Sequence, residues 1–177
     1  MSTFSNDWVY TDTVKDHFMH PRNVWENDSF QADGFGQVGS LACGDQMRVG
    51  IKVVDDKISE LKWQTYGCAS AIASTSMMSE IVIGMTLEEA YHLTPAMITE
   101  RLGGLPQHKF HCSVLGDKAL RAAIDDYLEK SGRENPYRRS VAKIICECKG
   151  ITDQRIEELV KTKQATTIEE LRQITQF

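Results

Sequence analysis

Three cysteines stand where the chain is expected to pass from a strand or a loop into a helix. They are Cys43, Cys68 and Cys112. At such junctions, unpaired amide N–H groups and the positive end of the helix dipole favour the thiolate, which is the form that binds metal or attacks sulfur. The positions of the three thiols therefore indicate a metal-binding or reactive site.

Each of these cysteines has a polar or flexible neighbour: Asp45 near Cys43, Gly67 before Cys68, and Lys109 and His111 before Cys112. In an extended segment, residues two apart project from the same face, so the carboxylate and the first thiol point the same way. Glycine permits a close backbone approach. Three thiols, one carboxylate and one imidazole form a mostly soft ligand set, which suits zinc or an iron–sulfur cluster.

A β-hairpin and two long helices are expected to position these residues. Apolar residues alternate over Met47–Val53 and again over Ser59–Thr65, and Asp55–Asp56 supplies the turn between them. Helical patterns follow over Ala69–Ile83, ended by a glycine, and over His111–Lys130.

Shorter sequence patterns predict the remaining elements of the first 130 residues. A short helix is expected near the N-terminus, stopped by Pro21. The glycine-rich segment Asp33–Ser40 suits a loop or a bulged edge strand. Thr86–Glu89 predicts a capping box, and Thr94–Pro95 predicts an N-cap with proline in the first helical position.

Four segments together carry a resemblance to a known family. They are Asp16–Val24, Cys43–Asp45, Tyr66–Ser74 and Lys109–Ser113. In this order, and over about residues 8–130, they resemble the motifs of the iron–sulfur cluster assembly scaffold family, the IscU/NifU-like proteins. The resemblance implies an α+β fold, in which a small antiparallel sheet packs against several helices and the three cysteines meet at one exposed tip.

The resemblance also implies a function, which is that of a scaffold and not of an enzyme. Sulfur from a cysteine desulfurase arrives as persulfide, Fe²⁺ joins it, and a transient [2Fe–2S] cluster is built and passed to acceptor proteins. Because thiol sites scavenge zinc, Zn²⁺ is a further candidate occupant of the isolated chain. By this resemblance the cluster or metal ligands are Cys43, Cys68 and Cys112, with Asp45 and His111 as candidate additional ligands and Lys109 beside the site. Because His111 and Lys109 can stabilise its thiolate, Cys112 is the candidate persulfide acceptor.

One departure from the family pattern concerns a chaperone. Residues Leu105–Lys109 keep only the outline of the family's Leu-Pro-Pro-Val-Lys segment. The resemblance therefore does not predict binding to a dedicated Hsp70-type chaperone.

The end of the chain forms a separate module in this interpretation. We expect a scaffold domain over residues 1–131, a linker over 132–140 and a short helical tail module over 141–177, with helices over Asp153–Lys161 and Ile168–Ile174. The module resembles the start of the BFD-like [2Fe–2S] domain of NifU-type proteins. It carries Cys146 and Cys148 but not the second Cys-x-x-Cys pair, so it is truncated, degenerate, or shares a site across a homodimer.

Three alternatives to the scaffold function stay open. Free cysteine is among the most buried residue types, so the thiols could simply be core packing. A structural zinc protein would hold Zn²⁺ tetrahedrally through Asp45, His111 and two or three cysteines. A thiol enzyme with a Cys–His–Asp constellation would need only one cysteine.

Composition excludes several other classes. The chain has 177 residues, of which 41 % are hydrophobic, and a net charge of −5. There is no basic stripe for nucleic acid, no apolar run long enough to span a membrane, and no secretory signal at the start. Five cysteines in such a chain indicate reduced thiols, so we expect a cytoplasmic protein without disulfides.

Overall fold

The computed structural model describes residues 10–26, 29–40, 45–106, 111–139, 144–146, 151–162 and 164–175. The chain divides into two compact units, Met1–Tyr137 and Arg138–Phe177. In the part of the chain that the structure describes, no helix is both long and apolar enough to span a membrane.

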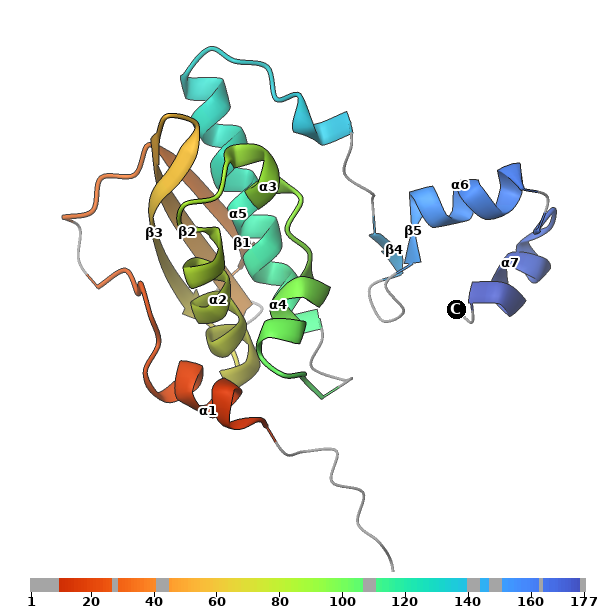
Figure 1. The fold of residues 1–177 in the computed structure, drawn as a ribbon, viewed down its shortest axis with the longest axis horizontal. Helices are drawn as coiled ribbons and strands as arrows, with labels where there is room; N and C mark the ends of the chain where they lie inside the picture. Colours follow the sequence, from red (N-terminus) through yellow and green to blue (C-terminus); the bar gives the residue numbers. More distant parts are fainter. Residues whose placement is uncertain are drawn as a thin grey trace, which may run out of the picture. The chain divides into compact units, whose positions relative to one another are not determined.

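A three-stranded antiparallel sheet forms one layer of the first unit (Figure 1). Its strands β1 (Gly34–Ser40), β2 (Asp45–Val54) and β3 (Lys57–Tyr66) lie in the order β1-β2-β3. The predicted hairpin is confirmed. Its turn residues Asp55 and Asp56 have φ values of 51° and 58°, the left-handed conformation that a two-residue hairpin turn needs.

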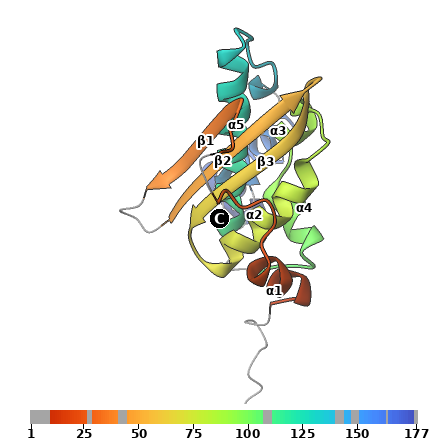
Figure 2. The ribbon, with the colours of Figure 1, turned by 90° about the vertical axis from the view of Figure 1, so that its left-hand side faces the viewer.

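Helices cover one face of this sheet (Figure 2). They are α1 (Asp12–Met19), α2 (Ala69–Val82), α3 (Leu87–Tyr91), α4 (Pro95–Arg101) and α5 (His111–Lys130). The predicted caps are confirmed, because the Thr86 and Thr94 side chains accept from the amides of Glu89 and Met97 at 3.2 and 3.4 Å. Helix α5 contributes much of the core through buried side chains on one side, among them Leu120, Ile124 and Leu128.

The glycine-rich segment forms the edge strand β1, and its glycines are required by packing. A Cβ at Gly34 would collide with the carbonyl oxygen of Ala123 in α5, and a Cβ at Gly36 with that of Ala119. The backbone of α5 therefore lies directly on β1. Strand periodicity alone could not show this contact, because it depends on a helix some 80 residues further along the chain.

Residues after α5 also pack on the first unit. The Arg133 guanidinium pairs with Asp56 in the hairpin turn. The Asn135 amide donates to Asp125 of α5, and the ring of Tyr137 lies 5.8 Å from that of Tyr91. These contacts fall inside the segment expected to be a linker, and the domain bounds at 131 and 141 stay a prediction.

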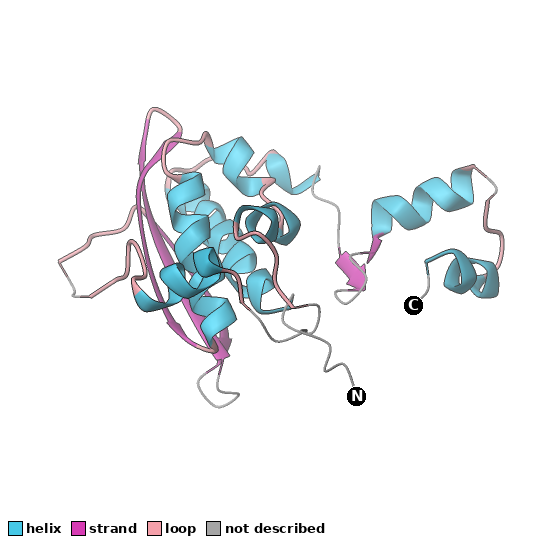
Figure 3. Ribbon diagram, turned by 60° about the horizontal axis from the view of Figure 1, so that its bottom comes forward, coloured by secondary structure: helices cyan, strands magenta, loops and turns pink. Residues whose placement is uncertain are grey.

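The second unit contains a two-stranded sheet and two helices (Figure 3). Its elements are β4 (Ile144–Cys146), β5 (Ile151–Thr152), α6 (Asp153–Lys161) and α7 (Ile168–Thr175). Both predicted helices are confirmed. Helix α7 begins with a capping box, in which the Thr167 hydroxyl accepts from the Glu170 amide and the Glu170 carboxylate accepts from the Thr167 amide.

Candidate metal centre

The candidate site lies at the end of the sheet where β2 begins and β3 ends. Asp45, the first residue of β2, pairs with Ser40, the last residue of β1. The next residue of β2, Gln46, pairs with Tyr66 at the end of β3. Cys43 belongs to the connection 41–44 between Ser40 and Asp45, which lies outside the described residues.

Cys68 lies at the same end, two residues beyond β3. It is the N-cap residue of α2, with extended backbone, and its carbonyl accepts from the Ile72 amide at 3.1 Å. The side chain is half-buried and is not in a disulfide. The strand-to-helix junction predicted for this cysteine is therefore confirmed.

Helix α5 also begins at this end. Gly34 of β1 lies against the carbonyl oxygen of Ala123, and Gly36, further along β1, lies against that of Ala119, which comes earlier in α5. Strand β1 and helix α5 are therefore antiparallel. A Cβ at Gly116 would lie 3.2 Å from the Thr75 hydroxyl, so the second turn of α5 packs against the second turn of α2. Three chain segments, those around Asp45, Cys68 and the start of α5, thus converge.

The predicted site residues are described to different extents. The structure gives backbone positions for Asp45, His111 and Cys112, while Cys43 and Lys109 lie outside the described residues. Among the side chains that are described, no group of three His, Cys, Asp or Glu forms a metal site. The ligand set thus stays a prediction.

The comparison with known families agrees with this geometry. Residues 9–134 match the family model described as NifU-like N terminal domain. The chain belongs to this family. Residues 144–177 match a second model, described as BFD-like [2Fe-2S] binding domain, and these residues contain the predicted tail module's two cysteines.

Two named relatives are similar over most of this chain. "Iron-sulfur cluster assembly scaffold protein IscU 1" of Archaeoglobus fulgidus is 50 % identical over 125 residues, which are 71 % of this chain and 80 % of that one. "Nitrogen fixation protein NifU" of Azospirillum brasilense is 41 % identical over 172 residues, 95 % of this chain but only 54 % of that one.

A solved structure confirms the fold. The N-terminal NifU-like protein from Brucella abortus superposes with a TM-score of 0.53 at 19 % identity, over 68 % of this chain and 94 % of that one. The predicted α+β fold, a small antiparallel sheet packed against several helices, is therefore correct.

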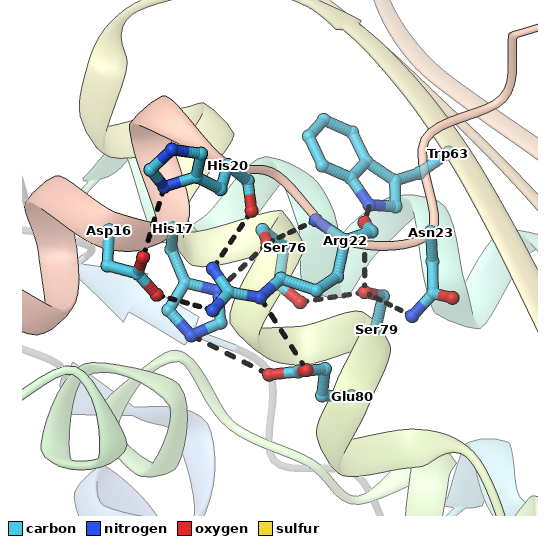
Figure 4. Close-up of polar contacts among 9 residues, drawn as sticks. All are labelled: Asp16, His17, His20, Arg22, Asn23, Trp63, Ser76, Ser79 and Glu80. Carbon is cyan, nitrogen blue, oxygen red and sulfur yellow. Dashed lines mark hydrogen bonds and ion pairs between the residues drawn. The ribbon is translucent and has the colours of Figure 1, made fainter.

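The N-terminal segment that resembles the NifU-like family builds a polar network which the sequence did not reveal (Figure 4). His17 is buried, and its Nδ1 lies 2.8 Å from the Ser76 hydroxyl of α2. The Arg22 amide donates to the same hydroxyl at 2.9 Å. The Glu80 carboxylate lies 3.6 Å from His17 Nε2 and 3.7 Å from Arg22 Nε.

Two signals in the sequence could have indicated this network. One is the motif Asp16–Val24 itself, and the other is the set of serines in α2, of which Ser70, Ser74, Ser76 and Ser79 are buried. Most buried hydroxyls have hydrogen-bond partners, so several serines in an otherwise apolar helix predict polar neighbours.

Hydrogen bonds and burial within the network shift two pKa values. Hydrogen bonds from Arg22 and then from His20 lower the pKa of the exposed Asp16 carboxyl. Burial lowers the pKa of His17, the positive charge of Arg22 lowers it further, and Glu80 opposes both effects. The structure therefore favours the neutral imidazole.

This shift predicts a loss of stability in mild acid. Below the ordinary pKa of 6.5, the unfolded chain takes up a proton at His17 while the folded chain does not, so the free energy of unfolding falls as pH falls. His17→Gln removes the titrating group. We expect urea unfolding to show that the wild type loses stability relative to this variant below pH 6.5. His20→Gln, at an imidazole that is 77 % exposed, is the control, and an equal effect there would contradict the prediction.

Proposed function

We propose that this chain is a scaffold on which iron–sulfur clusters are assembled and from which they pass to acceptor proteins. The observation that carries the proposal is the convergence of the start of β2 at Asp45, the N-terminus of α2 and the N-terminus of α5 at one end of the sheet. In the sequence, the motif cysteines Cys43, Cys68 and Cys112 lie at or within two residues of these three points. The name of the Archaeoglobus fulgidus relative supports the same function.

The chemistry of the donor set fits a cluster that is held only for a time. Thiolates of Cys43, Cys68 and Cys112 would bind the iron. The carboxylate of Asp45 would be the fourth ligand, a harder one that binds the iron less firmly than a thiolate. His111 is a further candidate ligand. Sulfur would arrive as persulfide from a cysteine desulfurase, with Cys112 as its acceptor, since Lys109 and His111 precede it and stabilise a thiolate.

Anaerobic reconstitution tests this proposal. The chain would be treated with ferrous iron, cysteine and a cysteine desulfurase, and absorption and Mössbauer spectra would be recorded. We expect a [2Fe–2S] signal that is lost in Cys43→Ala, in Cys68→Ala and in Cys112→Ala. We expect the signal to persist when Cys146 and Cys148 are both changed to Ala. Tightly held zinc and no cluster under any condition would support a structural zinc protein instead.

Asp45→Ala is expected to slow the release of the cluster to an acceptor. The carboxylate is a hard ligand that binds the iron of a cluster less firmly than a thiolate, so a site without it has lost its labile position. The measurement is the rate of transfer from the loaded chain to an apo-ferredoxin, followed by circular dichroism. Asp56→Ala, in the hairpin turn at the other end of β2, is the matched control and should transfer at the wild-type rate. An unchanged rate for Asp45→Ala counts against its role.

A further inference from the structure

The segment from Tyr10 to Arg22, called the strap below, is held to the rest of the first unit mainly by polar contacts. In α1, which the structure describes in full, Val14 is the one buried apolar side chain, whereas Phe18 is 40 % and Met19 is 67 % exposed. Burial of apolar surface is the main stabilising term for a packed helix. The strap is therefore attached much more weakly than α5, whose apolar side is buried along its length.

The contacts that do hold the strap are ones that water can replace. At its start, the Tyr10 hydroxyl lies 2.9 Å from the Ser70 hydroxyl, and the Thr11 hydroxyl donates to the Leu102 carbonyl at 2.6 Å. At its middle, His17 meets Ser76 of α2. Exchanging such hydrogen bonds for bonds to water changes the free energy by little. The serines left on α2 also tolerate contact with water.

The end of the strap is fixed. From Asn23 onward the chain pairs with β3: the Trp63 amide donates to the Asn23 carbonyl at 3.2 Å, and the Trp25 amide donates to the Trp63 carbonyl at 2.7 Å. Asn23 itself has a left-handed φ of 58°. The strap is thus joined to the sheet at one end and laid along α2 by replaceable contacts, which is the arrangement of a hinged element.

We propose that the strap opens and closes as a unit about Asn23 while the sheet, α2 and α5 stay folded, and that opening uncovers the first turn of α2 beside Cys68. Ser70, the partner of Tyr10, lies in this turn, two residues after the half-buried Cys68. A functional role for the uncovering of Cys68 rests on the proposed scaffold function. The opening of the strap does not depend on that function.

Hydrogen exchange read by mass spectrometry tests the opening. We expect the amides of α1 to exchange at least about a hundredfold faster than those of α2 and α5, because local opening needs less free energy than global unfolding. His17→Ala, which removes the central contact, should speed exchange in α1 by about tenfold more and leave α5 unchanged. Lys15→Ala, on the exposed side of α1, is the matched control and should change nothing. Equal protection of α1, α2 and α5 would overturn the proposal.

Alkylation of the chain without a bound cluster tests whether opening of the strap uncovers Cys68. The rate at which iodoacetamide modifies Cys68 is followed by peptide mass spectrometry, and it should rise severalfold in His17→Ala and not in Lys15→Ala. If His17→Ala fails to fold, Ser76→Ala removes the same hydrogen bond from the α2 side. An unchanged rate in a folded variant would refute the uncovering. Neither measurement involves a cluster, so a failed reconstitution would leave these results standing.

Discussion

Gly36→Ala is expected to destabilise the first unit by at least about 3 kcal/mol, or to prevent its folding. The new Cβ would collide with the carbonyl oxygen of Ala119 and lie 2.6 Å from the amide nitrogen of Ala123. Both atoms belong to the backbone in the middle of α5 and cannot rotate away. The helix would have to move off β1 and give up burial of Leu120 and Ile124.

Urea unfolding followed by far-UV circular dichroism measures this effect, and Gly84→Ala is its control. Gly84 has a φ of 90° and open space around its Cβ position, so alanine there suffers only the backbone strain of a left-handed residue, about 1–2 kcal/mol. The difference between the two variants isolates the collision with α5. A loss at Gly36 no larger than that at Gly84 would show that α5 does not press on β1.

Local patterns were sufficient to predict most of the first unit. The hairpin, the caps at Thr86 and Thr94 and the long helix α5 each follow from residues within a few positions of one another. The strand β1 was ambiguous, because its glycines reflect contact with α5 and not the preference of the segment itself. Tertiary contact thus decided the one element for which local propensity gave no answer.

Some features of the candidate site also follow from local sequence, whereas others depend on tertiary contacts. The junction at Cys68 is local and was predicted correctly. The convergence of Asp45 with the starts of α2 and α5 depends on strand register and on helix direction, which no motif encodes by itself, although the family resemblance implied it. Buried His17 was missed because a single histidine in a sequence does not show which hydroxyl it will meet.

A second buried titratable side chain lies in α5, five residues beyond Cys112. Asp117 is 1 % exposed, and its Oδ1 lies 3.0 Å from Arg121 Nη2. The pair lacks hydrogen-bond geometry, and Asp117 Oδ1 and Arg121 Nε are both buried without a hydrogen bond. Burial raises the pKa of the Asp117 carboxyl from 3.8 to about 6, and the charges of Arg121 and Lys118 oppose this only in part.

The raised pKa means that ionised Asp117 works against the fold at neutral pH. Between about pH 4 and pH 6 the folded chain holds a proton at Asp117 that the unfolded chain has released, so stability falls as pH rises through this window. A shift from 3.8 to about 6 corresponds to at most about 3 kcal/mol, fully lost above pH 6.

Asp117→Asn keeps the shape of the side chain and removes its charge. We expect the variant to exceed the wild type in free energy of unfolding by about 2–3 kcal/mol at pH 8. The difference should fall to about 1 kcal/mol at pH 4.5 and vanish below about pH 3. Urea titrations at several pH values measure this, each difference being taken at one pH so that the opposite contribution of His17 cancels. Glu129→Gln, at an exposed position of the same helix, should stay within about 0.5 kcal/mol of the wild type throughout. If Asp117→Asn is instead less stable at pH 8, the pair with Arg121 outweighs the burial of its charges, and the start of α5 is held in place by that ion pair.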